Sequence, residues 1–199
     1  MFGRGGEEAL ALTAAGIPVE VVPGVSAAVA APALAGIPVT HRGVSTAFVV
    51  VAGHAEEAYR PVLEGLHPHT ATIVVMMGLA RMREIAAVLV ERGWKFETPV
   101  AVLLGASKAG AETLTTTLGD LARGIGLMES DHPGTIVIGE VVRLRALLGI
   151  GRGESVAQPF RLRVKLRRTT VASAEVVRAA KGDGGRSRKG AAAGERSWL

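Results

Sequence analysis

The sequence of 199 residues contains no cysteine. Disulfide bonds, thiolate metal sites and thiol nucleophiles are therefore excluded within it, and the composition suits the reducing cytoplasm, where we expect the protein. No apolar run reaches the roughly 18 residues of a membrane span, because prolines and glycines interrupt the longest candidate, residues 21–39. The Gly/Arg/Glu-rich start does not resemble a signal peptide. We expect no association with a membrane.

The sequence also lacks the residue spacings of two kinds of catalytic site. No group of His, Asp and Glu residues has the spacing of a metal site, so no metal is expected. No Ser–His–acid set is evident either.

Charge is distributed unevenly along the chain. The net charge is +5. Residues 1–149 hold 11 basic and 14 acidic residues, whereas residues 150–199 hold 12 basic and 4 acidic residues. The part expected to fold therefore gives no electrostatic reason to expect nucleic acid as a partner. Residues 150–199 are rich in Gly, Ser, Ala, Lys and Arg, and we predict a disordered basic tail. A basic-tailed nucleic-acid-binding protein is an alternative that rests on this tail alone.

Two glycine-rich turns, at residues 3–6 and 23–24, each lead into a run of small residues. Glycines before a helix let the backbone approach a ligand closely, and alanine-rich helices leave little side chain in the way. We interpret residues 1–45 as half of a small-molecule cradle, with simple turn packing as the alternative. Glu7 and Glu8 occupy the positive end of the first helix, which argues against a phosphate site.

Strands and helices alternate along the chain, which predicts an α/β fold. Near-continuous apolar runs are typical of strands buried on both faces, and apolar residues at helical spacing predict helices. Strands are predicted at residues 19–22, 46–52, 71–77, 100–104, 112–118 and 135–140. Helices are predicted at residues 5–15, 25–35, 56–66, 79–92 and 118–124, and residues 141–148 complete the fold.

Several stretches together resemble uroporphyrinogen-III C-methyltransferases, which belong to the tetrapyrrole methylase superfamily. They are GRGGEEALALTAAGIPVEVVPGVSAAVAAPALAGIPVTHRG, VVAGH, TIVVMMGLARMREIAAVL, TPVAVL and IVIGEVVRLR. The blocks stand in the family's order, and the THRG block separates this branch from others with the same fold. The resemblance covers residues 1–148.

The resemblance implies a two-domain α/β architecture. Residues 1–42 would be the remnant of the first domain, residues 43–149 the second domain, and residues 150–199 the tail. The family's opening strand with its G-x-G-P-G-D turn and its L-K-G-G-D-P segment have no counterpart here. These departures predict an N-terminally truncated chain whose first domain is incomplete. The family's acid and base lie in those segments, so no catalytic residue is assigned.

The resemblance also implies a binding site for S-adenosylmethionine, the methyl donor. Ser26 and Ala27 match the cofactor-binding pair after P-G-V, with an N-cap serine and a small helical residue as the alternative. Met77 matches a cofactor-contacting methionine, although such a residue alone is more often core filler. Ala106 takes the place of a small loop residue and Met1 that of a backbone contact.

Arg4, His41 and Arg42 are the candidates for binding the carboxylates of uroporphyrinogen III, since arginine pairs with carboxylates in a bidentate way. Salt bridges that hold the domain junction are the alternative for Arg4 and Arg42. The implied reaction makes precorrin-2 for sirohaem and cobalamin synthesis, in a homodimer. A non-catalytic remnant of such an enzyme is the main alternative.

Overall fold

The computed structural model describes residues 5–125 and 131–149, which lie in one compact unit, Met1–Gln158. The helices are α1 (Gly5–Ala14), α2 (Ala27–Leu34), α3 (Glu56–Glu64), α4 (Met82–Glu91), α5 (Leu118–Ala122) and α6 (Leu144–Leu148), with 3-10 turns η1 (Leu79–Arg81) and η2 (Glu140–Arg143). The strands are β1 (Phe48–Ala52), β2 (Thr72–Met76), β3 (Pro99–Leu104), β4 (Glu112–Thr117) and β5 (Gly134–Ile138).

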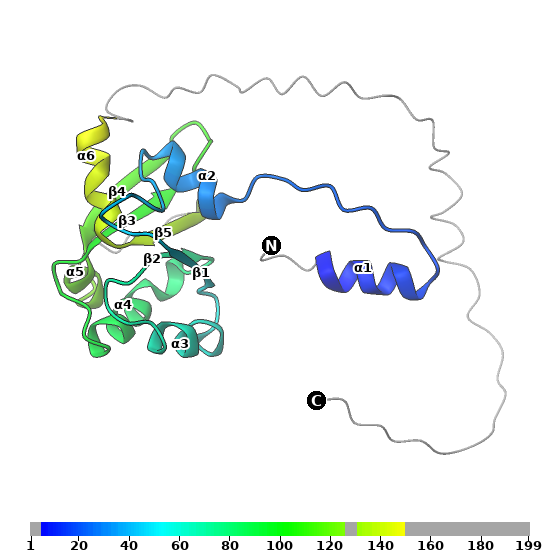
Figure 1. Cartoon of the computed structure of the whole chain (residues 1–199), viewed down its shortest axis with the longest axis horizontal. Helices are drawn as coiled ribbons and strands as arrows, with labels where there is room; N and C mark the ends of the chain where they lie inside the picture. Colours follow the sequence, from blue (N-terminus) through cyan, green and yellow to red (C-terminus); the bar gives the residue numbers. More distant parts are fainter. Residues whose placement is uncertain (1–4, 126–130, 150–199) are drawn as a thin grey trace, which may run out of the picture. The chain divides into compact units, whose positions relative to one another are not determined.

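The five strands form one mixed sheet in the order β1-β2-β5-β3-β4 (Figure 1). Strands β1 and β2 are parallel, while β5 runs antiparallel to both β2 and β3. Strand β4 pairs antiparallel with β3 and lies at the end of this order. The ends of β1, β2 and β3 therefore meet at one edge of the sheet, together with the start of β5.

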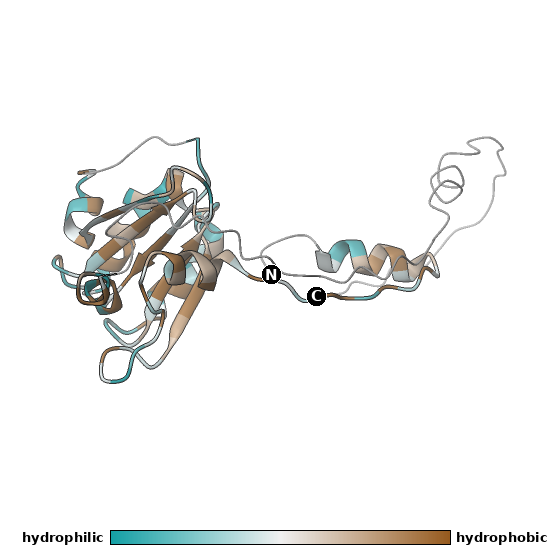
Figure 2. Cartoon of the chain, turned by 90° about the horizontal axis from the view of Figure 1, so that it is seen from above, coloured by the Kyte–Doolittle hydropathy of each residue, from teal (hydrophilic) through white to brown (hydrophobic). Residues whose placement is uncertain are grey.

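Side chains that alternate along the strands divide the core into two clusters. On one face, strand residues such as Val75, Val102 and Ile136 pack with residues of α3, α4 and α5, among them Leu63 and Leu89. Figure 1 shows these three helices together on one side of the sheet. Strands β2, β3 and β5 are almost wholly apolar and buried, as expected of strands covered on both faces, and apolar positions dominate the sheet in Figure 2.

The opposite face of the sheet is covered by α2 and by the chain around η2. Ala31, Ala35 and Ile37 form a buried cluster with residues of β3, β5 and η2, including Leu103 and Val137. Helix α2 contacts β5 and β2. Its alanines permit this close approach because they place no bulk between the helix and the sheet.

The predicted α/β fold is confirmed, and the helices and the last five strands form within a few residues of their predicted bounds. The strand predicted at residues 19–22 is wrong: these residues lie in a coil and pair with none of the described residues. A strand needs a partner for its backbone hydrogen bonds, and none of the described residues supplies one.

The domain boundary predicted at residue 42 stays a prediction, and residues on both of its sides belong to the compact unit. The predicted disordered tail, residues 150–199, lies outside the described residues. No helix in the described part of the chain is long and apolar enough to cross a membrane.

Candidate functional site

Two of the predicted cofactor residues lie at the same end of the sheet. Met77 directly follows β2, and Ala106 follows β3 by two residues. Met76 and Leu103 both pair with Thr135, one on each side of β5. Met77 and Ala106 are 29 positions apart in sequence. The strand order nevertheless places them on either side of β5.

Met77 has an unusual backbone for its type. Its φ is +56°, a left-handed conformation that non-glycine residues seldom adopt, and the residue is 49% exposed. The preceding Met76 points elsewhere, and its Sδ accepts a hydrogen bond from Thr135 Oγ1 at 3.8 Å. An exposed thioether on a strained turn is poorly explained as core filler, and strained residues cluster at ligand sites.

The turns after β1 and β2 are held against each other. The Gly53 N–H donates to the Met76 carbonyl at 2.7 Å, and Arg81 Nε donates to the His54 carbonyl at 3.3 Å. Gly53 and Gly78 are both buried, and their backbones touch without intervening side chains. These contacts with the turn after β1 therefore fix the position of Met77, which follows the parallel neighbour β2.

The loop between β3 and β4 is also tightly constrained. Gly105 has φ +58° and Ser107 has φ +70°, and the Gly105 N–H donates to the Pro133 carbonyl at 2.9 Å. Ala106 lies between them and packs against the cluster that contains Ala31 of α2. The predicted Ala106 loop and helix α2 therefore pack against the same buried cluster.

Ser26 is the N-cap of α2, and its Oγ accepts a hydrogen bond from the Ala28 N–H at 3.3 Å. The structural alternative for Ser26 is thereby confirmed, while cofactor binding by Ser26 stays a prediction. Ala27 is the first helical residue and is exposed, whereas Ala28 and Ala31 on the inner face are buried. The first residue of α2 therefore has a small, exposed side chain.

Two of the predicted substrate residues, His41 and Arg42, lie on a turn that precedes β1. The His41 N–H donates to the Ser45 carbonyl at 2.8 Å, and His41 and Arg42 are both exposed. Among the described residues, no salt bridge involves Arg42. Met1 and Arg4 lie outside the described residues.

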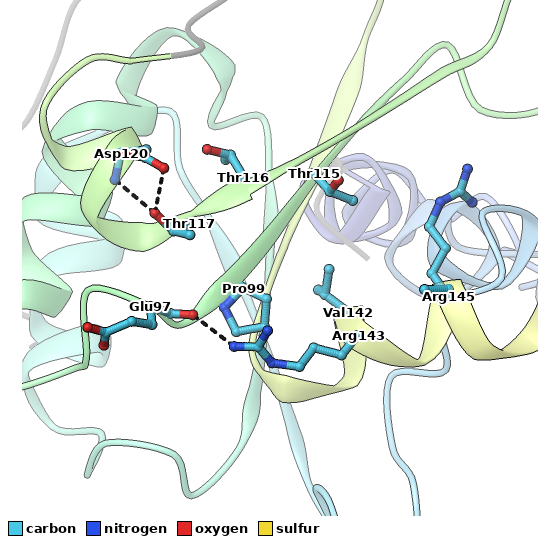
Figure 3. A pocket seen from close by; sticks show the side chains of 10 residues that line it. Glu97, Pro99, Thr115, Thr116, Thr117, Asp120, Val142, Arg143 and Arg145 are labelled. Carbon is cyan, nitrogen blue, oxygen red and sulfur yellow. Dashed lines mark hydrogen bonds between the residues drawn. The ribbon is translucent and has the colours of Figure 1, made fainter.

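A groove of about 780 Å³ lies at the other end of the sheet, beside the pair Pro99–Thr117 (Figure 3). Arg143 spans part of it, donating from Nη2 to the Glu97 carbonyl at 3.1 Å and from Nε to Glu140 Oε2 at 2.9 Å. The groove is lined by Glu97, Pro99, Thr115, Thr116, Thr117, Asp120, Val142, Arg143, Arg145 and Ala146. None of the predicted site residues is among them.

A second, much smaller hollow of about 10 Å³ includes Ser45, Thr72 and Trp94 in its lining. It also contains none of the predicted residues. Within residues 5–125 and 131–149, no three His, Cys, Asp or Glu side chains gather in a way that could hold a metal ion.

The sequence reasoning missed the roles of Gly53 and Gly78 and the strained backbone of Met77 and Ser107. The glycines were visible as strand-end residues in VVAGH and MMG. Nothing in the sequence indicated that they touch, because this depends on the parallel pairing of β1 with β2.

Comparisons with known proteins give consistent results. The family profile described as Tetrapyrrole (Corrin/Porphyrin) Methylases matches residues 1–122. The chain is 40% identical over 146 residues to the uroporphyrinogen-III C-methyltransferase of Methanocaldococcus jannaschii, covering 72% of this chain and 60% of that one. It is 43% identical over 156 residues to siroheme synthase 2 of Aeromonas hydrophila, covering 77% of this chain and 33% of that protein.

A solved structure agrees with these relatives. The uroporphyrin-III C-methyl transferase of Thermus thermophilus, complexed with S-adenyl homocysteine, matches with a TM-score of 0.62 and 37% sequence identity. The match covers 72% of this chain and 63% of that one. The chain thus spans less than two thirds of the length of these relatives.

Proposed function

Because this chain belongs to the tetrapyrrole methylase family, we propose that it takes part in the S-adenosylmethionine-dependent C-methylation of uroporphyrinogen III. The observation that carries this proposal is the placement of Met77 and Ala106 on either side of β5 at one end of the sheet. These residues come from separate stretches of sequence: Ala106 packs against the buried cluster that contains Ala31 of α2, and Met77 follows β2, a strand that α2 contacts.

In this proposal, Ser26, Ala27, Met77 and Ala106 form one wall of the cofactor site, and Met1 adds a backbone contact. Adenosine and methionine are held by backbone N–H and C=O groups only where side chains are small enough to let them approach. The exposed Ala27, the small Ala106 and the left-handed turn at Met77 fit this requirement. When bound, S-adenosylmethionine supplies an electrophilic methyl group.

Arg42, His41 and Arg4 would bind the carboxylates of the substrate. The exposure of Arg42, without a salt bridge among the described residues, supports a role in binding an anion from outside the chain. Its guanidinium offers a planar pair of donors that matches a carboxylate.

The residues of this chain would contribute mainly to orientation. Methyl transfer from a sulfonium to an electron-rich pyrrole carbon gains from in-line placement and from a shielded cleft. Proton loss from the methylated carbon needs a base, and no residue of this chain is assigned that role. The product would be precorrin-2. Homodimeric assembly and a cytoplasmic location are further parts of the proposal.

The alternative is a non-catalytic remnant that binds no cofactor. Calorimetric titration of the full chain with S-adenosylhomocysteine separates the two functions. We expect saturable heat with a micromolar Kd, whereas no heat at high micromolar ligand would support the remnant.

A further inference from the structure

The loop that precedes β5 carries an imidazole to the end of the sheet where Met77 and Ala106 lie. Strand β5 begins at Gly134, and His132 stands two residues before it. Because β5 runs antiparallel to both β2 and β3, the residues before its start lie at the end of the sheet where those two strands finish. The topology therefore adds an exposed histidine to the proposed cofactor site.

Two contacts fix His132 beside the Ala106 loop. The Gly105 N–H donates to the Pro133 carbonyl at 2.9 Å, which extends the pairing of β3 with β5 beyond the two strands. A Cβ atom at Gly105 would lie 3.6 Å from His132 Cγ and 3.7 Å from His132 Cβ. The side chain of His132 therefore lies beside the backbone of Gly105, the residue before Ala106.

The other groups along this part of the sheet edge are mostly small or apolar. Leu79 packs on Gly134, since a Cβ atom there would lie 2.8 Å from both Cδ atoms of Leu79. Pro133 and Ala106 add further apolar surface from the two neighbouring loops. An exposed aromatic ring among apolar groups suits a planar heterocycle, because such a ring can be stacked and partly shielded from water.

We propose that His132 is a further residue of the cofactor site and that its imidazole ring stacks on the adenine of S-adenosylmethionine. The inference rests on the proposed function, because it places the cofactor beside Met77 and Ala106. Imidazole and purine are both planar and aromatic, and a contact through the ring face uses neither ring nitrogen. His132 thus adds an aromatic contact to a wall of small side chains, a methionine and backbone groups.

Calorimetric titration of the full 199-residue chain with S-adenosylhomocysteine and with 5′-methylthioadenosine tests the stacking. Both ligands carry adenine, but only S-adenosylhomocysteine carries a carboxylate. His132→Ala should weaken the binding of both ligands by the same factor, at least about fivefold, because truncation removes an aromatic side chain from a stacked base. His132→Phe should bind both ligands about as tightly as the wild type, because it keeps a planar ring.

His67→Ala is the matched control. His67 is exposed and lies between α3 and β2, at the opposite end of β2 from Met77. Its replacement should leave both affinities unchanged, and circular dichroism shows whether every variant folds. In NMR spectra, the Cε1 proton of His132 should move upfield with either ligand, because a stacked purine shields it, whereas that of His67 should not move.

The possible results separate this inference from the proposed function. Unchanged affinity in His132→Ala would overturn the inference and leave the proposed function intact. A loss for S-adenosylhomocysteine alone would assign His132, beside the exposed Lys108 of the same edge, to the carboxylate, and equal losses in His132→Ala and His132→Phe would assign it to a hydrogen bond. Either result overturns the stacking. If the wild-type chain binds neither ligand, the proposed function fails together with the inference.

Discussion

Gly53 and Gly78 touch backbone to backbone at the ends of the parallel strands β1 and β2. A Cβ atom at Gly53 would lie 2.6 Å from Gly78 Cα and 2.7 Å from Val75 Cγ1, closer than packed atoms approach. This contact allows the two turns to lie against each other. Met77, the residue before Gly78, is thereby held in its left-handed conformation.

Replacing Gly53 by alanine should therefore destabilise the protein. We expect Gly53→Ala to lower the free energy of unfolding by about 1–3 kcal/mol, because an added methyl group in a packed core forces the backbone apart. Urea denaturation measures the change. Gly65→Ala is the control, because a Cβ there would meet the Pro61 carbonyl oxygen at an ordinary 3.5 Å. Equal losses in the two variants would contradict the close-contact explanation.

A larger side chain at position 27, at the start of α2, should block the proposed cofactor site. We expect Ala27→Leu to weaken binding of S-adenosylhomocysteine at least about tenfold, because its side chain would fill the space taken by the ligand. Ala33→Leu is the matched control, since Ala33 is exposed on the same helix but points in a different direction. Calorimetry measures both affinities, and circular dichroism confirms that both variants fold. If the Ala27→Leu variant binds S-adenosylhomocysteine with unchanged affinity, Ala27 does not belong to the cofactor site.

Arg145 joins two elements that are far apart in sequence. On α6, its guanidinium donates to the carbonyl of Ala35, the C-cap of α2. The last carbonyls of a helix lack partners within the helix, so this bond satisfies one of them. Arg145→Met should lower the free energy of unfolding by about 1–2 kcal/mol.

Arg60→Met provides the comparison for Arg145. Arg60 pairs with Glu56 and Glu64 on the surface of α3, and solvent screening leaves such exposed pairs with little net effect on stability. Thermal and urea unfolding of both variants would show whether the Arg145 bond is the stronger. A smaller loss for Arg145→Met than for Arg60→Met would contradict its role in anchoring α2.

The start of α5 should make stability depend on pH. Thr117 Oγ1 accepts from the Asp120 N–H at 3.1 Å and donates to Asp120 Oδ2 at 2.8 Å, while Arg123 Nη2 donates to Oδ1 at 2.6 Å. The hydrogen bond from Thr117, followed by that from Arg123, lowers the pKa of Asp120 below its usual value. A lowered folded-state pKa adds stability above the unfolded-state pKa, and this stability is lost as the pH falls through the folded-state value.

Thr117→Val should therefore destabilise the protein by about 1 kcal/mol at neutral pH through loss of the cap, and by less in acid. It should also raise the pKa of Asp120 toward its usual value, as measured by NMR titration of the carboxyl carbon. Thr115→Val, an exposed position on the same strand, is the control and should leave that pKa unchanged. If the pKa of Asp120 is unchanged in the Thr117→Val variant, Arg123 and not Thr117 lowers that pKa.

The sequence predicted the elements of the sheet well because each strand carries its own signal. Residues 71–77 and 100–104 are apolar runs bounded by turns, and they became β2 and β3. The stretch at residues 19–22 has the same kind of signal but stayed unpaired. Local composition favours an extended backbone, whereas a strand also needs a neighbour, which local composition does not provide.

The candidate site was only partly predictable. Ser26, Met77 and Ala106 follow from the resemblance to the tetrapyrrole methylases, which the family match confirms. Their cofactor contacts stay predictions. The strain at Met77 and the contact between Gly53 and Gly78 were not foreseen, since both depend on how the strand ends meet.

By itself, the sequence determined the α/β class, the family and the succession of helices and strands, because periodicity, turn residues and family motifs are local properties of the chain. Only the tertiary structure decided that β5 lies between β2 and β3, and so placed Met77 and Ala106 at one end of the sheet. Several strands of this chain are similarly apolar, and any of them could bury its side chains beside any other. The order of the strands is therefore set by how all the side chains pack together in three dimensions.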